Sequence, residues 1–128
     1  MNYNISKKVD SNFQDTISKV TNELQNEGFG IITEIDLQNK FKEKLGIDFR
    51  NYKILGVCNP AMAYKAIEIE DKIGTMLPCN IVVQEHENGE VEVSAINPMS
   101  SIGAIENKDL QIIANEVSDK LKDIIERM

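Results

Sequence analysis

An Asn-Gly pair late in the chain constrains the fold more than any other feature of the sequence. Asn88 and Gly89 stand between two β-compatible runs, residues 79–85 and 90–96. This dipeptide is the strongest short-range signal for a two-residue hairpin, because both positions of the favoured turn need positive φ. In the second run the apolar residues alternate with polar ones: Val91, Val93 and Ala95. The hairpin predicts two adjacent antiparallel strands, which a strict βαβ doubly wound fold lacks.

Further elements are predicted on both sides of the hairpin. Strands are expected from about residue 3 to 7, from 29 to 34 and from 52 to 57. Helices are expected where apolar residues recur at spacings of three and four: Phe13, Ile17, Val20 and Leu24; Leu37, Phe41 and Leu45; Leu110, Ile113, Val117, Leu121, Ile124 and Met128. Gly28 and Gly46 end the first two of these helices. A short, alanine-rich helix follows Asn59 and Pro60, which suit the N-cap and first helical positions.

The resulting order is β-α-β-α-β-α-β-β-α, so an α+β fold is favoured, with helices on one face of a mostly antiparallel sheet. No repeat or linker interrupts it, and residues 1–128 are expected to form a single domain. A chain of 128 residues with 41% hydrophobic residues can build its own core.

Charge and cysteine content limit the possible partners and compartments. The net charge of −7 argues against nucleic-acid and anionic-membrane partners, which need a cationic surface. No export signal or membrane-spanning apolar run is present, so the reducing cytosol is the expected location. Two cysteines and one histidine fall short of a four-ligand zinc site, and neither a metal nor a cofactor is expected.

Both cysteines lie in similar short motifs, Cys58-Asn59-Pro60 and Cys79-Asn80 after a proline. Cys58 directly precedes a predicted helix start, whose partial positive charge favours a thiolate. Alternatively, each cysteine packs as a small hydrophobic side chain. If the two strands are neighbours, the thiols can approach each other and form a dithiol. A pocket at these five residues is the candidate ligand site.

Two other features are weaker candidates. His86 precedes the hairpin turn, where a histidine is usually solvated, so a cysteine–histidine catalytic pair is not favoured. The loop over residues 98–105 carries apolar residues that are expected to be exposed and to form a lid or, with more reason, a dimer contact.

Several motifs together resemble the domain of unknown function family 302. They are Gly28-Phe-Gly, Thr33-Glu-Ile-Asp36, Lys42-Glu-Lys-Leu-Gly46, Tyr52-Lys-Ile-Leu-Gly-Val-Cys-Asn-Pro60, Gly74 with Leu77-Pro-Cys-Asn80, and Val93-Ser-Ala-Ile-Asn-Pro98. The resemblance spans nearly the whole chain. It implies a fold similar to the TATA-binding-protein-like β-α-β(4)-α arrangement with short inserted helices, and a homodimer. It implies no catalytic residues, and fold similarity to DNA-binding proteins does not imply DNA binding.

Three functional hypotheses follow, in order of preference. The first is a cytosolic homodimeric module that binds a small ligand or partner near Cys58, Asn59, Pro60, Cys79 and Asn80. The second is a purely structural role for the two motifs. The third is a thiol-dependent enzyme or redox protein that uses Cys58 with Cys79.

Overall fold

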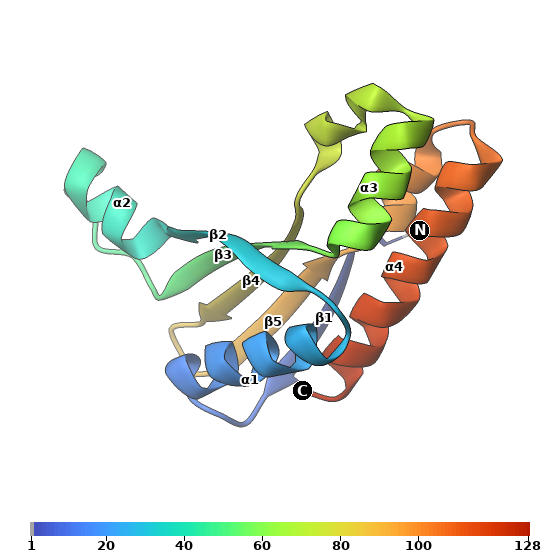
Figure 1. Cartoon of the computed structure of the whole chain (residues 1–128). Helices are drawn as coiled ribbons and strands as arrows, with labels where there is room; N and C mark the ends of the chain where they lie inside the picture. The colour runs from blue at the N-terminus through green and yellow to red at the C-terminus, as the bar shows by residue number, and fades with distance from the viewer. Residues whose placement is uncertain (1) are drawn as a thin grey trace.

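Five strands form one sheet in the computed structural model, which describes residues 2–128 (Figure 1). The strands are β1 (Asn4–Val9), β2 (Gly30–Asp36), β3 (Tyr52–Cys58), β4 (Cys79–Glu85) and β5 (Val91–Ile96). The helices are α1 (Phe13–Asn26), α2 (Leu37–Leu45), α3 (Pro60–Ile69) and α4 (Lys108–Glu126). Residues 2–128 also contain three 3₁₀ segments: η1 (Asp71–Met76), η2 (Pro98–Ser100) and η3 (Ile102–Ala104).

The strand order is β1-β5-β4-β3-β2, and every neighbouring pair is antiparallel. The predicted hairpin joins β4 to β5, with Val83 opposite Val93. Gly89 has a φ of 87° but Asn88 does not have a positive φ, so the turn differs from the two-residue turn that an Asn-Gly pair favours. The His86 N–H donates to the Glu90 carbonyl at 2.7 Å, which leaves residues 87–89 as the loop. The α+β class with an antiparallel sheet is therefore confirmed.

The main core lies between the sheet and two helices. One face of β4 and β5 contributes alternate side chains that are buried: Ile81, Val83, Val91, Val93 and Ala95. Val20 and Leu24 of α1 and Leu121 of α4 are fully buried in the same cluster. The amphipathic stripes predicted for these two helices are thus confirmed, and they explain why α1 and α4 cover this face. The opposite face of the sheet, called the open face below, carries the other alternate side chains.

A second cluster joins α3, α4 and the loop after β5, and it contains Ala66, Ile73, Ile102, Leu110 and Ala114. The prediction of an exposed apolar loop over residues 98–105 is wrong at its principal residues. Pro98 and Ile102 are buried, because η2 and η3 fold this loop against α4 of the same chain.

Helix ends follow the local sequence. The Asn59 side chain accepts a hydrogen bond from the Met62 N–H at 3.3 Å, with Pro60 as the first helical residue. Gly28 and Gly46 have φ values of 83° and 65° where α1 and α2 end. These signals act over a few residues, and all of them are confirmed.

Helix α2 projects from the rest of the molecule, away from α1, α3 and α4 (Figure 1). None of its residues is buried, although its sequence carries an apolar side. Phe41 contacts Phe49 edge-to-face with ring centroids 5.0 Å apart, whereas Leu45 is 65% exposed. Residues 37–50, called the α2 arm below, therefore leave apolar surface uncovered.

Across residues 2–128, the length and apolarity that a bilayer-spanning helix needs are not met by any helix.

Candidate functional site

Cys58 is the last residue of β3 and immediately precedes the cap of α3. It is half-buried and a free thiol. The sequence places it there through Asn59 and Pro60, which stop the strand and begin the helix within two residues. The strand-to-helix corner predicted at Cys58 is confirmed.

Cys79 begins β4, the strand next to β3. It lies opposite Val57 in the antiparallel register, so Cys58 is one residue away along the neighbouring strand. Cys79 is 8% exposed and is also a free thiol. The sheet therefore brings the two cysteines, 21 positions apart in the sequence, onto adjacent strands.

Both cysteine residues line one small cavity, called the thiol cavity below, of about 30 Å³. Residues of β3, β4, α3 and α4 and of the connecting segments line it. Its lining residues are Phe29, Val57, Cys58, Asn59, Met62, Ala63, Ala66, Leu77, Cys79, Ile102, Ile113, Ala114 and Val117. Alanine side chains at three helical positions in this set leave the space that larger residues would fill. None of the lining side chains is charged.

This apolar setting controls the acidity of the thiols. Burial raises the pKa of Cys79 to about 11, and the nearby Cys58 adds to the increase. Burial also raises the pKa of Cys58. Both shifts favour the protonated thiol over the thiolate at neutral pH. Burial therefore opposes the thiolate that was expected at Cys58 from the helix start.

The structure brings together three of the five predicted site residues and separates the other two. Cys58, Asn59 and Cys79 line the thiol cavity, whereas Pro60 is exposed at the first turn of α3. Asn80 is exposed and lies opposite Gly56, on the open face. Successive side chains of a strand point to opposite faces, which is why Cys79 and Asn80 diverge.

The family model of the domain of unknown function DUF302 matches residues 5–128. The chain belongs to the DUF302 family. The structure is similar to a crystal structure described as an uncharacterized conserved DUF302 protein from Bacillus stearothermophilus. That match has a TM-score of 0.90 and 29% sequence identity, and it covers 98% of this chain and 97% of the other. No curated protein matches the chain.

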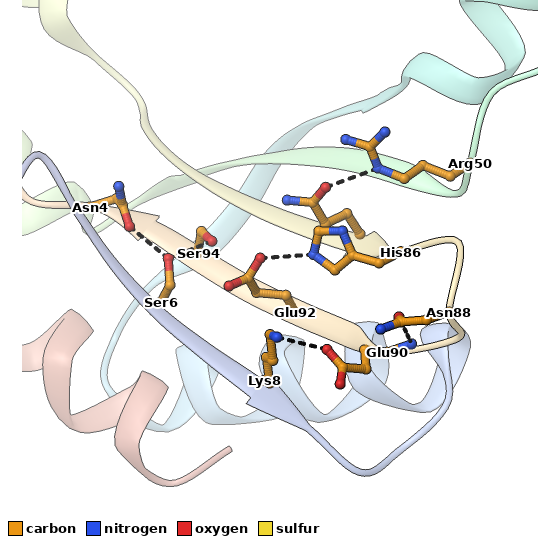
Figure 2. A network of polar contacts seen from close by, with 10 residues as sticks. Asn4, Ser6, Lys8, Arg50, His86, Asn88, Glu90, Glu92 and Ser94 are labelled. Carbon is orange, nitrogen blue, oxygen red and sulfur yellow. Dashed lines mark hydrogen bonds and ion pairs between the residues drawn. The ribbon is translucent and has the colours of Figure 1, made fainter.

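The open face of this DUF302 chain carries a polar network (Figure 2). His86 Nε2 lies 3.0 Å from Glu92 Oε1, and Arg50 Nε donates to Gln84 Oε1 at 3.1 Å (Figure 2). The His86 side chain is thus engaged with Glu92 across the β4–β5 pair. Because His86 is absent from the lining of the thiol cavity, the two cysteines have no histidine partner there.

A groove of about 380 Å³ runs along the open face. Its lining residues are Tyr3, Asn4, Ser6, Tyr52, Asn80, Val82, Gln84, Glu92, Ser94 and Ile96. Several of these polar groups are already paired: the Ser6 and Ser94 hydroxyls are 2.7 Å apart, and the Ser6 hydroxyl donates to Asn4 Oδ1 at 2.6 Å. The groove is larger than the thiol cavity, but several of its polar side chains are already hydrogen-bonded within the protein.

Sequence reasoning missed Met62 and the alanines of α3 as parts of the site. The spacing of Met62, Ala63 and Ala66 places them on one face of α3, and this spacing was a usable signal. The contributions of Ile113 and Ala114 from α4 depend on tertiary packing and had no local signal.

Proposed function

We propose that this DUF302 protein is a small-ligand-binding module whose site is the thiol cavity. The observation that carries the proposal is the convergence of Cys58, Asn59 and Cys79 on one cavity. A concave and mainly apolar site with a few polar groups is the usual form of a small-molecule site. Because no charged side chain lines this cavity, sulfur contacts and apolar packing would hold the ligand.

Thermal melting with two classes of small probe tests this proposal: single apolar atoms such as xenon, and metal ions such as Ag(I) and Zn(II). A ligand at one hundred times its Kd stabilises the folded state by about 2.7 kcal/mol. For a chain of this size that corresponds to a rise in Tm of roughly 10 °C. We expect at least one class to raise the Tm of the wild type.

Variants locate the effect. The rise in Tm should be lost in Cys58→Ser and Cys79→Ala. It should persist in Asn80→Ala, which alters the open face and serves as the matched control. Equal shifts in all three variants, or no shift of the wild type with any probe, would refute the proposal.

The electrostatics of the thiol cavity do not favour the alternative, a thiol-dependent enzyme or redox protein that uses Cys58 with Cys79. Burial raises the pKa of both thiols, and His86 lies on the open face. Free thiols are expected in the reducing cytosol, which is the compartment we propose. Alkylation of Cys58 at pH 7 faster than that of free cysteine would reverse this preference.

We also propose that the protein is a homodimer and that the α2 arm contacts the second copy. The arm leaves Leu45 and Ile47 exposed by 65% and 49%, and the adjoining β2 exposes Ile32 by 60%. Uncovered apolar surface of this kind is typical of an interface.

Charge supports the choice of a second copy as the partner. The α2 arm carries four basic and two acidic side chains, which leaves ten basic and nineteen acidic ones in the rest of the chain. The arm therefore has a net charge of +2 and the remainder −9. Opposite charges on the arm of one copy and the body of the other favour association.

Sedimentation velocity tests the dimer. We expect the wild type to sediment as a dimer and the double variant Leu45→Gln/Ile47→Gln as a monomer. Tyr64→Gln/Ile112→Gln, which alters exposed residues of α3 and α4, is the control and should remain dimeric. A wild-type monomer at all concentrations would contradict the proposal.

The connectivity further supports the finer fold assignment that we propose, a TATA-binding-protein-like β-α-β(4)-α arrangement. Strands β2 to β5 are consecutive neighbours, α1 connects β1 to β2, and α4 ends the chain. Helices α2 and α3 are the insertions. Superposition of an experimental structure on that fold tests the assignment.

A further inference from the structure

The groove on the open face, called the open-face groove below, has a layout that the strand register explains. Ser6 of β1, Ser94 of β5 and Val82 of β4 lie opposite one another and form a row of short side chains across the sheet. The rows on either side of it carry longer side chains: Asn4 with Ile96, and Tyr52 with Gln84 and Glu92. A short row between two longer ones leaves a hollow, which accounts for the groove of about 380 Å³.

Hydrogen bonds at the floor of the groove fix three side chains and leave part of each one unused. The Ser6 hydroxyl donates its only proton to Asn4 Oδ1 at 2.6 Å (Figure 2). The Ser94 hydroxyl is therefore the donor in its 2.7 Å contact with Ser6. Ser94 Oγ is left able to accept a further hydrogen bond, and the Asn4 NH₂ group is left able to donate.

The other end of the groove is held in the same way. Arg50 Nε donates to Gln84 Oε1 at 3.1 Å, which fixes the amide and leaves its NH₂ group as a donor. His86 Nε2 lies 3.0 Å from Glu92 Oε1, which leaves Glu92 Oε2 as an acceptor (Figure 2). The lining side chains are thus oriented by their neighbours before any ligand arrives.

The unused groups include both donors and acceptors. Amide NH₂ groups of Asn4, Gln84 and the exposed Asn80 can donate, and Glu92 Oε2 and Ser94 Oγ can accept. An anionic ligand would meet a carboxylate, because none of the described residues that line the groove is basic. A cation would meet one carboxylate but also three amide donors. A hydroxyl group both donates and accepts, so a neutral molecule with several hydroxyl groups matches this mixed set.

The size and the aromatic content of the groove narrow the class further. A volume of about 380 Å³ lies within the range of roughly 300–1,000 Å³ that is usual for small-molecule sites. Tyr3 and Tyr52 belong to the lining, and each offers an apolar ring with a polar hydroxyl group. A sugar ring has C–H groups that pack on aromatic rings and hydroxyl groups that need hydrogen-bond partners, so it can use both kinds of surface.

We infer that the open-face groove binds a neutral saccharide. Glu92 and Ser94 accept hydrogen bonds from its hydroxyl groups. The amides of Asn4, Asn80 and Gln84 donate to them. This site shares no lining residue with the thiol cavity, so it is separate from the site of the proposed function and each can be tested without the other.

Titration of the ¹⁵N-labelled full chain with glucose, galactose and N-acetylglucosamine tests the inference by NMR, because amide shifts report both the Kd and the location of the ligand. We expect at least one sugar to bind with a Kd on the order of 1 mM and to shift the lining residues of β4 and β5 most. Glu92→Gln should weaken binding about tenfold, and Ser94→Val, which fills the hollow, should abolish it. Glu90→Gln is the matched control, because Glu90 pairs with Lys8 outside the groove lining and should not affect binding.

The outcomes also separate the two sites. The inference is wrong if no sugar shifts the lining residues, or if Glu92→Gln and Ser94→Val, folded as their spectra show, bind as tightly as the wild type. Binding of phosphate or tetramethylammonium in the groove in place of a sugar would overturn it as well. Cys58→Ser should bind the sugar as the wild type does. Loss of binding in that variant alone would place the sugar at the thiol cavity, which would overturn this inference and leave the proposed function standing.

Discussion

Gly56 lies beside the candidate site where no side chain fits, and its replacement by alanine should destabilise the fold. A Cβ at Gly56 would overlap Thr33 Oγ1 and would lie 2.8 Å from Pro78 Cγ. Thr33 is on the surface and can rotate its hydroxyl, but the Pro78 ring is stiff and directly precedes Cys79. Relief therefore requires movement of β2 or of the start of β4.

Overpacking of this kind costs about 1–3 kcal/mol. For a domain of this length that corresponds to a Tm lower by roughly 3–12 °C. Gly30→Ala is the matched control, because Gly30 also lies in a strand and a Cβ there meets nothing within 4 Å. That control should be neutral or slightly stabilised through a less flexible unfolded chain.

Differential scanning calorimetry of the two variants decides the matter. Adding Thr33→Ala to Gly56→Ala removes the closest contact and should restore part of the lost stability. The reasoning is refuted if Gly56→Ala and Gly30→Ala have the same Tm. It is also refuted if Thr33→Ala does not raise the Tm of Gly56→Ala, because the clash with Thr33 would then not be the cause of the lost stability.

Two further predictions concern α4 and Cys79. Asn107→Ala should lower the free energy of unfolding in urea by about 1 kcal/mol, because the Asn107 side chain accepts a hydrogen bond from the Leu110 N–H at 3.1 Å. Asn115→Ala, at an exposed position within the same helix, is the control. An equal loss of stability in both variants would contradict the capping role of Asn107. Burial holds the pKa of Cys79 at about 11, above its value of about 9 when unfolded. The stability that this shift contributes is complete below pH 9 and is lost as the pH rises toward 11, so the wild type should lose about 1–2 kcal/mol between pH 8 and pH 10 relative to Cys79→Val. Parallel pH profiles for the two proteins would refute it.

Much of the fold follows from short-range signals. Asn88-Gly89 determines the hairpin, and the apolar spacing of α1 and α4 determines which side of each helix packs on the sheet. Asn59 and Pro60 begin α3. Each of these signals acts through backbone conformation or periodicity within a few residues. Signals of this short range can be recognised in a single sequence.

The site was only partly predictable. The prediction that the two cysteines lie on neighbouring strands is confirmed, because the order of the strands follows from their antiparallel connections. Grouping Asn80 with Cys79 disregarded the alternation of side chains along a strand. Met62 was not predicted as a lining residue, because the alanines of its helix indicated only close packing. The part played by α4 depends on packing across the domain.

The projection of the α2 arm was not predictable from the sequence, for a different reason. Its apolar spacing resembles that of α1, and periodicity alone does not reveal which surface an amphipathic helix covers. In this chain the arm contacts β3 mainly through aromatic packing at Phe49, and the rest of its apolar side is exposed.

The central claim is that the thiol cavity, which Cys58, Asn59 and Cys79 line, is a ligand site. Crystals of the protein exposed to Ag(I), a soft monovalent ion that does not change oxidation state under these conditions, test it most directly. We predict a single anomalous difference peak inside the thiol cavity, beside Cys79. A peak bonded to Cys58 alone on its solvent side, or separate peaks on the two cysteines, would contradict the account.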